Sequence, residues 1–152
     1  MNRGNLASLL HLAAWFVVIS IAILARTDFP LSEAVAKLTG ELVFLCGMFV
    51  FAWAVACLKA GFLGNVEPVS DAVVTQGPYK FVRHPVYLGM VVATVGLVIA
   101  LSSLWGLLAA LLFFTPTAIY RAKLEEDAMA RKFGREWDDY VSRTSFMLPR
   151  IY

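Results

Sequence analysis

One uninterrupted apolar run dominates the hydropathy pattern of this chain. The 36 residues from Pro85 to Tyr120 include no charged side chain, and polar and charged clusters close the run at both ends. A single helix of that length, rising about 1.5 Å per residue, would measure roughly 54 Å, nearly twice the ~30 Å hydrocarbon thickness of a bilayer. The polar pair Ser102-Ser103 divides the run, so we predict a helical hairpin made of two membrane spans, Pro85–Leu101 and Leu104–Tyr120.

Two further apolar stretches precede this hairpin. Leu6–Ala25 contains His11 as its only ionisable group, and Leu42–Leu58 contains none. The first stretch exceeds the 7–15 apolar residues of a signal peptide, so we expect a retained helix rather than a cleaved leader. The chain is 60% hydrophobic and 16% charged, against roughly 25% charged in soluble domains. We therefore predict an all-α polytopic membrane protein with four transmembrane helices.

We expect the whole chain, residues 1–152, to form a single domain. Residues 1–58 are expected to hold two N-terminal transmembrane helices, and residues 59–152 the functional core. From Arg121 to Asp139 acids and bases alternate around apolar positions, which predicts a cytoplasmic extension of the fourth helix that breaks near Gly134. The remainder is expected to include a C-terminal amphipathic helix on the cytoplasmic side.

Basic residues indicate the orientation. With four crossings, both termini and the loop 59–84 share one side, which collects eleven of the thirteen Lys and Arg residues, so this side should be cytoplasmic. The net charge of +2 does not suggest a nucleic-acid partner. Cys46 and Cys57 lack a CxxC spacing and are expected to pack as small apolar residues, not to form a disulfide or a metal site.

Candidate chemistry lies at the start of the third predicted helix. Pro85 suits the first helical position, where its missing N–H costs nothing. The free N–H groups of that turn can receive an anion. His84 and Tyr87 are three residues apart and should share a face. The alternative is an interfacial aromatic belt, with Arg83 reaching lipid phosphate.

A second candidate group lies where the hairpin returns. Arg121 and Glu125 are spaced i, i+4 and should point the same way, opposite the His84 cluster at the same membrane surface. A solvated ion pair is the alternative explanation. Glu126 and Asp127 are expected to point elsewhere and to be solvated.

These motifs together resemble a known family. The segment GPYKFVRHPVYLG, an apolar hairpin, the pair Glu125-Glu126, Phe133-Gly134, Tyr140 and Leu148-Pro149 are similar to the isoprenylcysteine carboxyl methyltransferase and phospholipid methyltransferase family over roughly residues 59–152. The resemblance implies an enzyme that binds S-adenosylmethionine under the cytoplasmic ends of its last helices and takes a lipophilic substrate from the bilayer. No Gly-x-Gly occurs, which argues against a Rossmann-type methyltransferase.

The resemblance also assigns residues. It implies cofactor contacts from Asp71, Ala72, Val73, Val74, Tyr79, His84, Pro85, Val86, Tyr87 and Glu125, with Arg121 as the catalytic residue facing the substrate. Aromatic faces attract a sulfonium cation, and a carboxylate suits ribose hydroxyls. A carboxylate acceptor, as on a prenylated cysteine, needs no general base and suits the planar fork of Arg121.

Other interpretations stay open. This chain has fewer predicted helices than the eukaryotic isoprenylcysteine enzymes, so a prenylated thiol carboxylate, a phospholipid amine and another lipophile are all possible acceptors. The Arg-His-Pro-x-Tyr motif also occurs in membrane sterol reductases, which would make the cofactor NADPH. A non-catalytic membrane scaffold would explain the spans but not the clustered His, Tyr, Arg and Glu residues.

Overall fold

The described residues of this computed structural model, 3–25, 29–58 and 72–149, form helices and connecting turns without a β-strand. The all-α prediction is therefore confirmed for this part of the chain. In chain order the elements are α1 (Arg3–Leu24), α2 (Glu33–Leu58), the 3-10 helix η2 (Gly77–Lys80), α3 (Pro85–Ala100), α4 (Leu104–Ala109), the π-helical turn η3 (Ala110–Phe114), α5 (Thr115–Phe133) and α6 (Arg135–Arg143).

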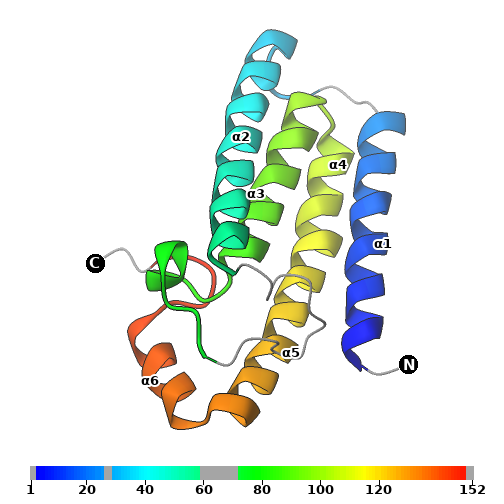
Figure 1. The fold of residues 1–152 in the computed structure, drawn as a ribbon. Helices are drawn as coiled ribbons and strands as arrows, with labels where there is room; N and C mark the ends of the chain where they lie inside the picture. Colours follow the sequence, from blue (N-terminus) through cyan, green and yellow to red (C-terminus); the bar gives the residue numbers. More distant parts are fainter. Residues whose placement is uncertain (1–2, 26–28, 59–71, 150–152) are drawn as a thin grey trace.

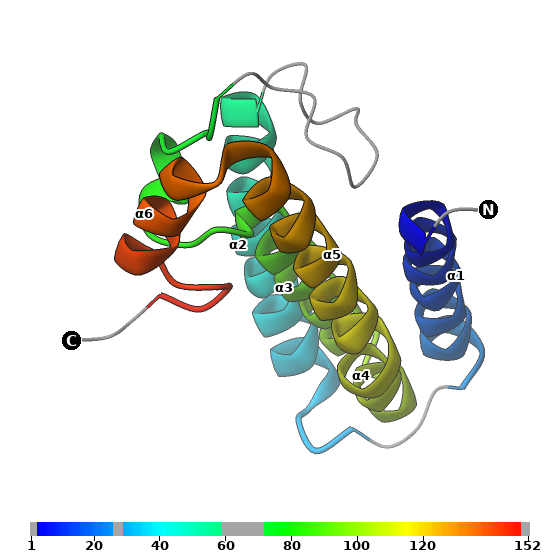
Figure 2. The ribbon, with the colours of Figure 1, turned by 90° about the horizontal axis from the view of Figure 1, so that it is seen from below.

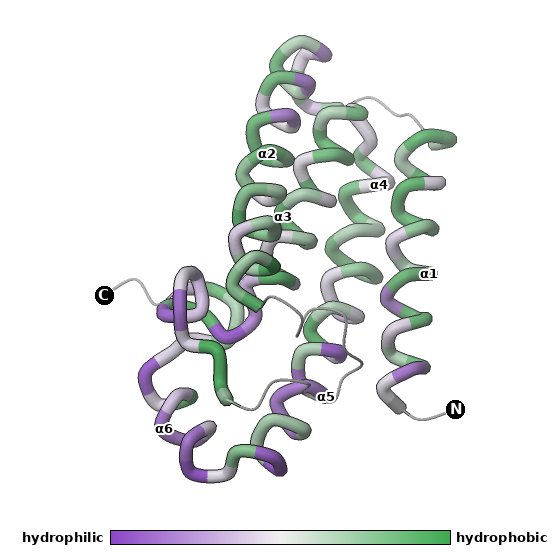
Figure 3. The backbone as a smooth tube through the Cα atoms, viewed as in Figure 1, coloured by the Kyte–Doolittle hydropathy of each residue, from purple (hydrophilic) through white to green (hydrophobic). Residues whose placement is uncertain are grey.

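The long helices run up and down side by side (Figures 1 and 2). In the part of the chain that the structure describes, three of them are long and apolar enough to cross a membrane: Gly4–Leu24, Glu33–Leu58 and the continuous helical segment Leu104–Phe133. The fourth apolar helix, α3, is shorter, at 16 residues. Polar and apolar residues are separated along the length of the molecule. The polar half of α5 and all of α6 lie at one end, and the apolar helices lie above them (Figure 3).

The reversal between α3 and α4 is built around the predicted polar pair. Ser102 adopts a positive φ of 51°, and Ser103 is fully buried. The Ser103 hydroxyl accepts a hydrogen bond from Gly106 N at 3.1 Å and donates one to the carbonyl of Ala25 at 3.2 Å. Ser103 therefore caps α4 and joins the turn to the end of α1.

Glycines bring α2 and α3 into backbone contact. A Cβ atom at Gly96 would lie 2.2 Å from Phe44 N on α2, so no side chain fits there. Three other glycines show the same close approach: Gly40, Gly47 and Gly89. Small residues at helix interfaces allow this geometry, which is common in membrane helices.

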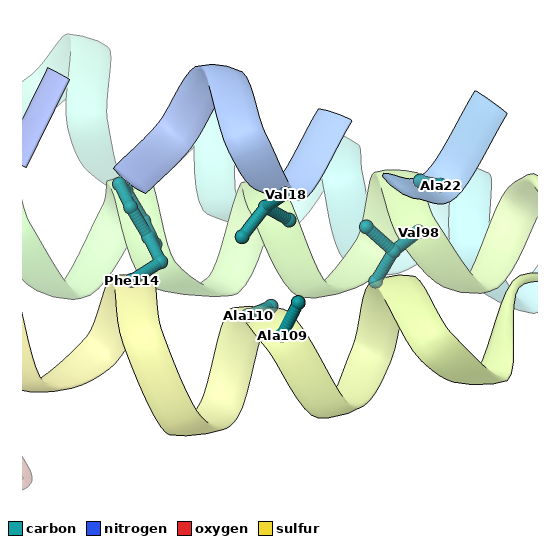
Figure 4. Packing of buried hydrophobic residues seen from close by; sticks show 6 residues of the cluster. All are labelled: Val18, Ala22, Val98, Ala109, Ala110 and Phe114. Carbon is teal, nitrogen blue, oxygen red and sulfur yellow. The ribbon is translucent and has the colours of Figure 1, made fainter. Parts of the chain in front are cut away.

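α1 completes the bundle through an apolar core that it shares with α3, α4 and η3. Figure 4 shows the six residues of this cluster, Val18, Ala22, Val98, Ala109, Ala110 and Phe114. Many large apolar side chains elsewhere on α1 and α2 are exposed, including Leu9, Phe16 and Phe49. Such an outer surface is what a bilayer, not water, would solvate.

The start of α2 differs from the expected one, whereas the break after α5 agrees with it. α2 begins at Glu33, well before the predicted start at Leu42, because the charged residues Lys37 and Glu41 stay exposed on its first turns without interrupting the helix. The predicted break at Gly134 is confirmed, since Gly134 has a φ of 51° between α5 and α6. Helix α6 then buries Trp137 and Tyr140.

The rod formed by α4, η3 and α5 contains a π-helical turn. Pro116 lacks an N–H and its ring would collide with the carbonyl four residues earlier in a regular α-helix. The wider turn accommodates it, and the Thr115 hydroxyl donates to the carbonyl of Ala110 at 3.0 Å. The helix thus continues past the proline and carries Arg121 and Glu125 to the polar end of the bundle.

Candidate functional site

The turn before α3 is fixed by neighbours on both sides. Gly77 has a φ of 58°, and a Cβ there would lie 2.6 Å from the Cys57 sulfur, so η2 packs directly on the end of α2. On its other side the Tyr140 hydroxyl donates to the Tyr79 carbonyl at 2.8 Å. Burial, together with the nearby Tyr140 and Glu125, raises the pKa of Tyr79. Burial also raises the pKa of Tyr140, so both phenols stay neutral donors.

The C-terminal segment closes over the same turn. Arg83 N donates to Ser145 O at 2.8 Å, Ser145 N donates to Phe81 O at 3.1 Å, and His84 N donates to Phe146 O at 3.2 Å. This short parallel pairing is a contact that the sequence analysis did not predict. It fixes the backbone immediately before α3. The centre of the His84 ring then lies 5.0 Å from the centre of the Phe146 ring.

The two predicted clusters meet. Tyr87 on α3 donates a hydrogen bond from its hydroxyl to the carboxylate of Glu125 on α5. Arg121 Nε lies 3.6 Å from the same carboxylate oxygen, and the guanidinium carbon lies 5.9 Å from the centre of the Tyr87 ring. His84 Nδ1 lies 4.0 Å from the other oxygen of Glu125. The expectations that Arg121 and Glu125 share a face, and that His84 and Tyr87 do, are confirmed.

Glu126 is part of this network, and the expectation that it would be solvated is wrong. Arg83 Nε donates to Glu126 Oε1 at 2.6 Å, and His84 Nε2 lies 3.3 Å from that oxygen. Arg83 also donates to the carbonyl of Thr144 at 2.6 Å. Arg83 and His84 precede the helix, so their side chains spread beyond one helical face and reach both acidic residues. Asp127 is exposed, as expected.

The remaining residues implied by the resemblance fall into two places. Pro85 is the buried first residue of α3, and Val86 follows it half-buried. Val73 is buried with Trp137 and Tyr140, and its N–H donates to Glu136 at 3.3 Å. Its neighbours Ala72 and Val74 are exposed and half-buried, and Asp71 lies outside the described residues. Val73 therefore packs against α6, whereas His84 and Tyr87 lie with Glu125.

His11 on α1 was missed as a site residue. Its Nδ1 lies 3.0 Å from the Thr117 hydroxyl, and its ring stacks on Phe114 with centres 4.6 Å apart. The His11 and Tyr87 rings are nearly perpendicular, with centres 5.9 Å apart. The signal was in the sequence, because an ionisable residue inside a membrane span usually serves a purpose. Helix α1 thus packs near Tyr87, which donates to Glu125, so a third helix joins α3 and α5 at this site.

The arrangement suits a ligand that carries both positive charge and hydroxyl groups. Aromatic faces attract a cation, and the Glu125 carboxylate accepts hydrogen bonds. No group of three or more His, Cys, Asp or Glu side chains within the described ranges is placed to hold a metal ion.

Part of this chain is similar to three known proteins, two of which are named as methyltransferases. A phosphatidylethanolamine N-methyltransferase B from Dictyostelium discoideum is 30% identical over 101 residues, covering 62% of this chain and 50% of that protein. The nickel-cobalt-cadmium resistance protein NccN from Alcaligenes xylosoxydans xylosoxydans is 38% identical over 84 residues, covering 54% and 38%. Methanethiol S-methyltransferase 1 from Bradyrhizobium diazoefficiens is 38% identical over 74 residues, covering 47% and 24%. The chain thus spans half the length of these relatives or less.

A sequence model of one family covers most of the structure described above. The phospholipid methyltransferase model matches residues 35–136, which include nearly all of α2, the turn before α3, and α3 to α5 with both acidic residues. Because this match covers more than half of the chain, the chain belongs to the phospholipid methyltransferase family.

Proposed function

We propose that this protein transfers a methyl group from S-adenosylmethionine to a lipophilic acceptor within a membrane. The observation that carries the proposal is that Tyr87 and Arg121 both contact Glu125 at the polar end of an apolar helical bundle. An aromatic ring, a carboxylate and a guanidinium lie within one small region there, next to helices that lipid can surround. The family to which the chain belongs supports the reaction class.

The cofactor would be held from α3 and α5. The Tyr87 ring can face the sulfonium, and Glu125 can accept from the ribose hydroxyls. The first bond of the α3 ladder runs from Leu88 N to His84 O. The N–H groups of Val86 and Tyr87 therefore precede that ladder and suit the cofactor's carboxylate, with the positive end of the helix dipole behind them. Tyr79, in η2 before α3, would add a further aromatic ring to this site.

Arg121 would hold an anionic group of the acceptor in line with the sulfonium methyl. A carboxylate, such as that of a prenylated cysteine, fits the planar guanidinium in a bidentate manner and is already ionised. A phospholipid phosphate offers the same oxygen geometry, and it would present an amine as the methylated atom. The relative named as a phosphatidylethanolamine N-methyltransferase favours this second acceptor.

We further propose that the chain crosses the membrane four times. Helix α3, with 16 residues, spans about 24 Å and would need the turn at Ser102-Ser103 to lie just below the headgroups. The lower end in Figure 1, with the polar half of α5 and the amphipathic α6, would be cytoplasmic, since most basic residues of the chain lie on that side.

Ligand binding in detergent tests the cofactor. We expect isothermal titration calorimetry to detect S-adenosylhomocysteine binding and no NADPH binding. Incubation with methyl-labelled S-adenosylmethionine and membrane lipids should then place label in a lipid fraction. Binding of NADPH alone would support a reductase of the sterol reductase type, and binding of neither would favour a scaffold. Either result would overturn the proposal.

A further inference from the structure

Two side chains that pack near Tyr87 each have a buried nitrogen atom without a hydrogen-bond partner among the described residues: His11 Nε2 and Arg121 Nε. His11 is only 5% exposed, and its ring centre lies 5.9 Å from that of Tyr87. The Arg121 guanidinium carbon lies 5.9 Å from the same ring. Buried polar atoms are nearly always satisfied in proteins, so two unsatisfied atoms around one ring point to a ligand that supplies their partners.

The hydrogen bonds around Thr117 determine which His11 nitrogen carries the proton. A threonine hydroxyl has one proton, and Thr117 donates it to the carbonyl of Phe114 at 2.7 Å. Its oxygen must therefore accept from His11 Nδ1, which lies 3.0 Å away. The neutral ring then has its proton on Nδ1 and a lone pair on Nε2. Nε2 is thus an unbonded base, held in position by Thr117 and by stacking on Phe114.

We propose that His11 Nε2 accepts the proton of the methyl acceptor. This inference rests on the proposed methyl transfer and adds the acceptor class: an amine or thiol whose nucleophilic atom must lose a proton. Nε2 takes that proton, the freed lone pair forms a bond to the methyl carbon, and the electrons of the S–CH3 bond return to sulfur. The products are the methylated acceptor, S-adenosylhomocysteine and an imidazolium that releases its proton to solvent. A carboxylate acceptor needs no such base.

A purely structural role for His11 explains less of the observed geometry than a role as a base does. A tether between α1 and α5 accounts for the bond to Thr117 and the stacking on Phe114. It does not account for a buried Nε2 without a hydrogen-bond partner on a ring that packs near Tyr87. Within the described ranges, the titratable and charged groups that face His11 are Tyr87 on α3 and Arg121 on α5, with Glu125 bonded to Tyr87.

The test uses the full chain in lipid nanodiscs with three acceptor probes: phosphatidylethanolamine, decanethiol and N-acetyl-farnesylcysteine. His11→Phe keeps an aromatic ring against Phe114 but has no nitrogen. We expect it to lower kcat/KM for the amine or thiol probe about a hundredfold or more, with S-adenosylhomocysteine affinity changed less than threefold. Ser8→Ala, which removes another polar group from α1, is the matched control and should stay near wild type.

Two readouts separate a base from a tether. The kcat/KM of the wild type should depend on pH through one ionisation that disappears in His11→Phe. In His11→Ala, added imidazole should restore transfer, whereas pyrrole, which has the same shape and no basic lone pair, should not.

Three outcomes would overturn the assignment. They are transfer to the farnesylcysteine carboxylate only, equal rescue by imidazole and pyrrole, and parallel losses of transfer and cofactor affinity. Absence of cofactor binding in the wild type would instead remove the proposed function itself.

Discussion

Tyr87, in the first turn of α3, donates a hydrogen bond to Glu125, which lies 38 positions further along the chain on α5. This bond forms because the chain reverses at Ser102-Ser103 and α5 returns to the level at which α3 began (Figure 1). It brings the two groups proposed for sulfonium and ribose recognition into direct contact. The same bond orients the carboxylate toward Arg121.

Replacing Glu125 should weaken cofactor binding. Glu125→Ala removes a charge-assisted hydrogen bond worth about 1.5–3 kcal/mol, so the Kd for S-adenosylhomocysteine should rise roughly ten- to a hundredfold in calorimetry. Glu125→Gln keeps an acceptor oxygen and should lose less. Unchanged affinity in Glu125→Ala would show that this carboxylate does not contact the cofactor.

Replacing Glu126 should act on stability instead. Glu126→Ala leaves Arg83, whose side chain is 10% exposed, without its carboxylate partner. We expect a loss of about 1–2 kcal/mol in unfolding free energy, at the low end for a charged pair because 24% of the Glu126 side chain is exposed. The neighbouring exposed Asp127→Ala is the control. Equal melting temperatures for the two variants in detergent would contradict a structural role for Glu126.

Local sequence signals predicted the parts of the site that lie within single helices. Pro85 at the first position of α3, the i, i+4 pair Arg121 and Glu125, and the break at Gly134 all follow from helix geometry and backbone chemistry. The close approach of α3 and α5 followed from the length of the apolar run between them.

Contacts between distant segments could not be predicted in this way. The pairing of Arg83 with Ser145 depends on how the C-terminal segment folds back after α6. The inclusion of Glu126 depends on the side-chain directions of residues before a helix, where helical periodicity does not apply. His11 stood out as a lone ionisable group, but its partner Thr117 is 106 positions away and nothing local links them.

The contact between α2 and α3 should be intolerant of any side chain. In Gly96→Val the new Cβ would lie 2.2 Å from the backbone nitrogen of Phe44, which moves only if the helices separate. Overpacking of this kind destabilises by about 1–3 kcal/mol or more, so the melting temperature in detergent should fall clearly. Ala52→Val, at an exposed position on α2, should have little effect. Similar melting temperatures for both variants would contradict the close packing.

Labelling should reveal the orientation of the bundle. Ser32 is exposed just before α2, and Asp138 is exposed on α6 at the opposite end of the molecule. In a background with Cys46 and Cys57 replaced by alanine, an impermeant maleimide should label Ser32→Cys in intact cells. Asp138→Cys should react only after permeabilisation, because the basic end is expected inside. Labelling of Asp138→Cys in intact cells would reverse the proposed topology.

Arg121 should separate acceptor handling from cofactor handling. Its Nε lies 3.6 Å from Glu125, beyond a hydrogen bond, so the cofactor site should survive its removal. We expect Arg121→Ala to lower kcat/KM for methyl transfer by about two orders of magnitude or more, with S-adenosylhomocysteine affinity nearly intact. Loss of cofactor binding in this variant would place Arg121 in the cofactor site instead.

Arg121→Lys identifies what the guanidinium recognises. Lysine keeps the positive charge but has no planar fork, so bidentate contact with a carboxylate or phosphate is lost. If the acceptor is held by two parallel hydrogen bonds, Arg121→Lys should retain only a small part of the wild-type kcat/KM. Full activity would mean that charge alone suffices and that the acceptor presents no paired oxygens to this residue. Comparing the two variants on the same lipid acceptor therefore distinguishes geometric recognition from simple charge attraction.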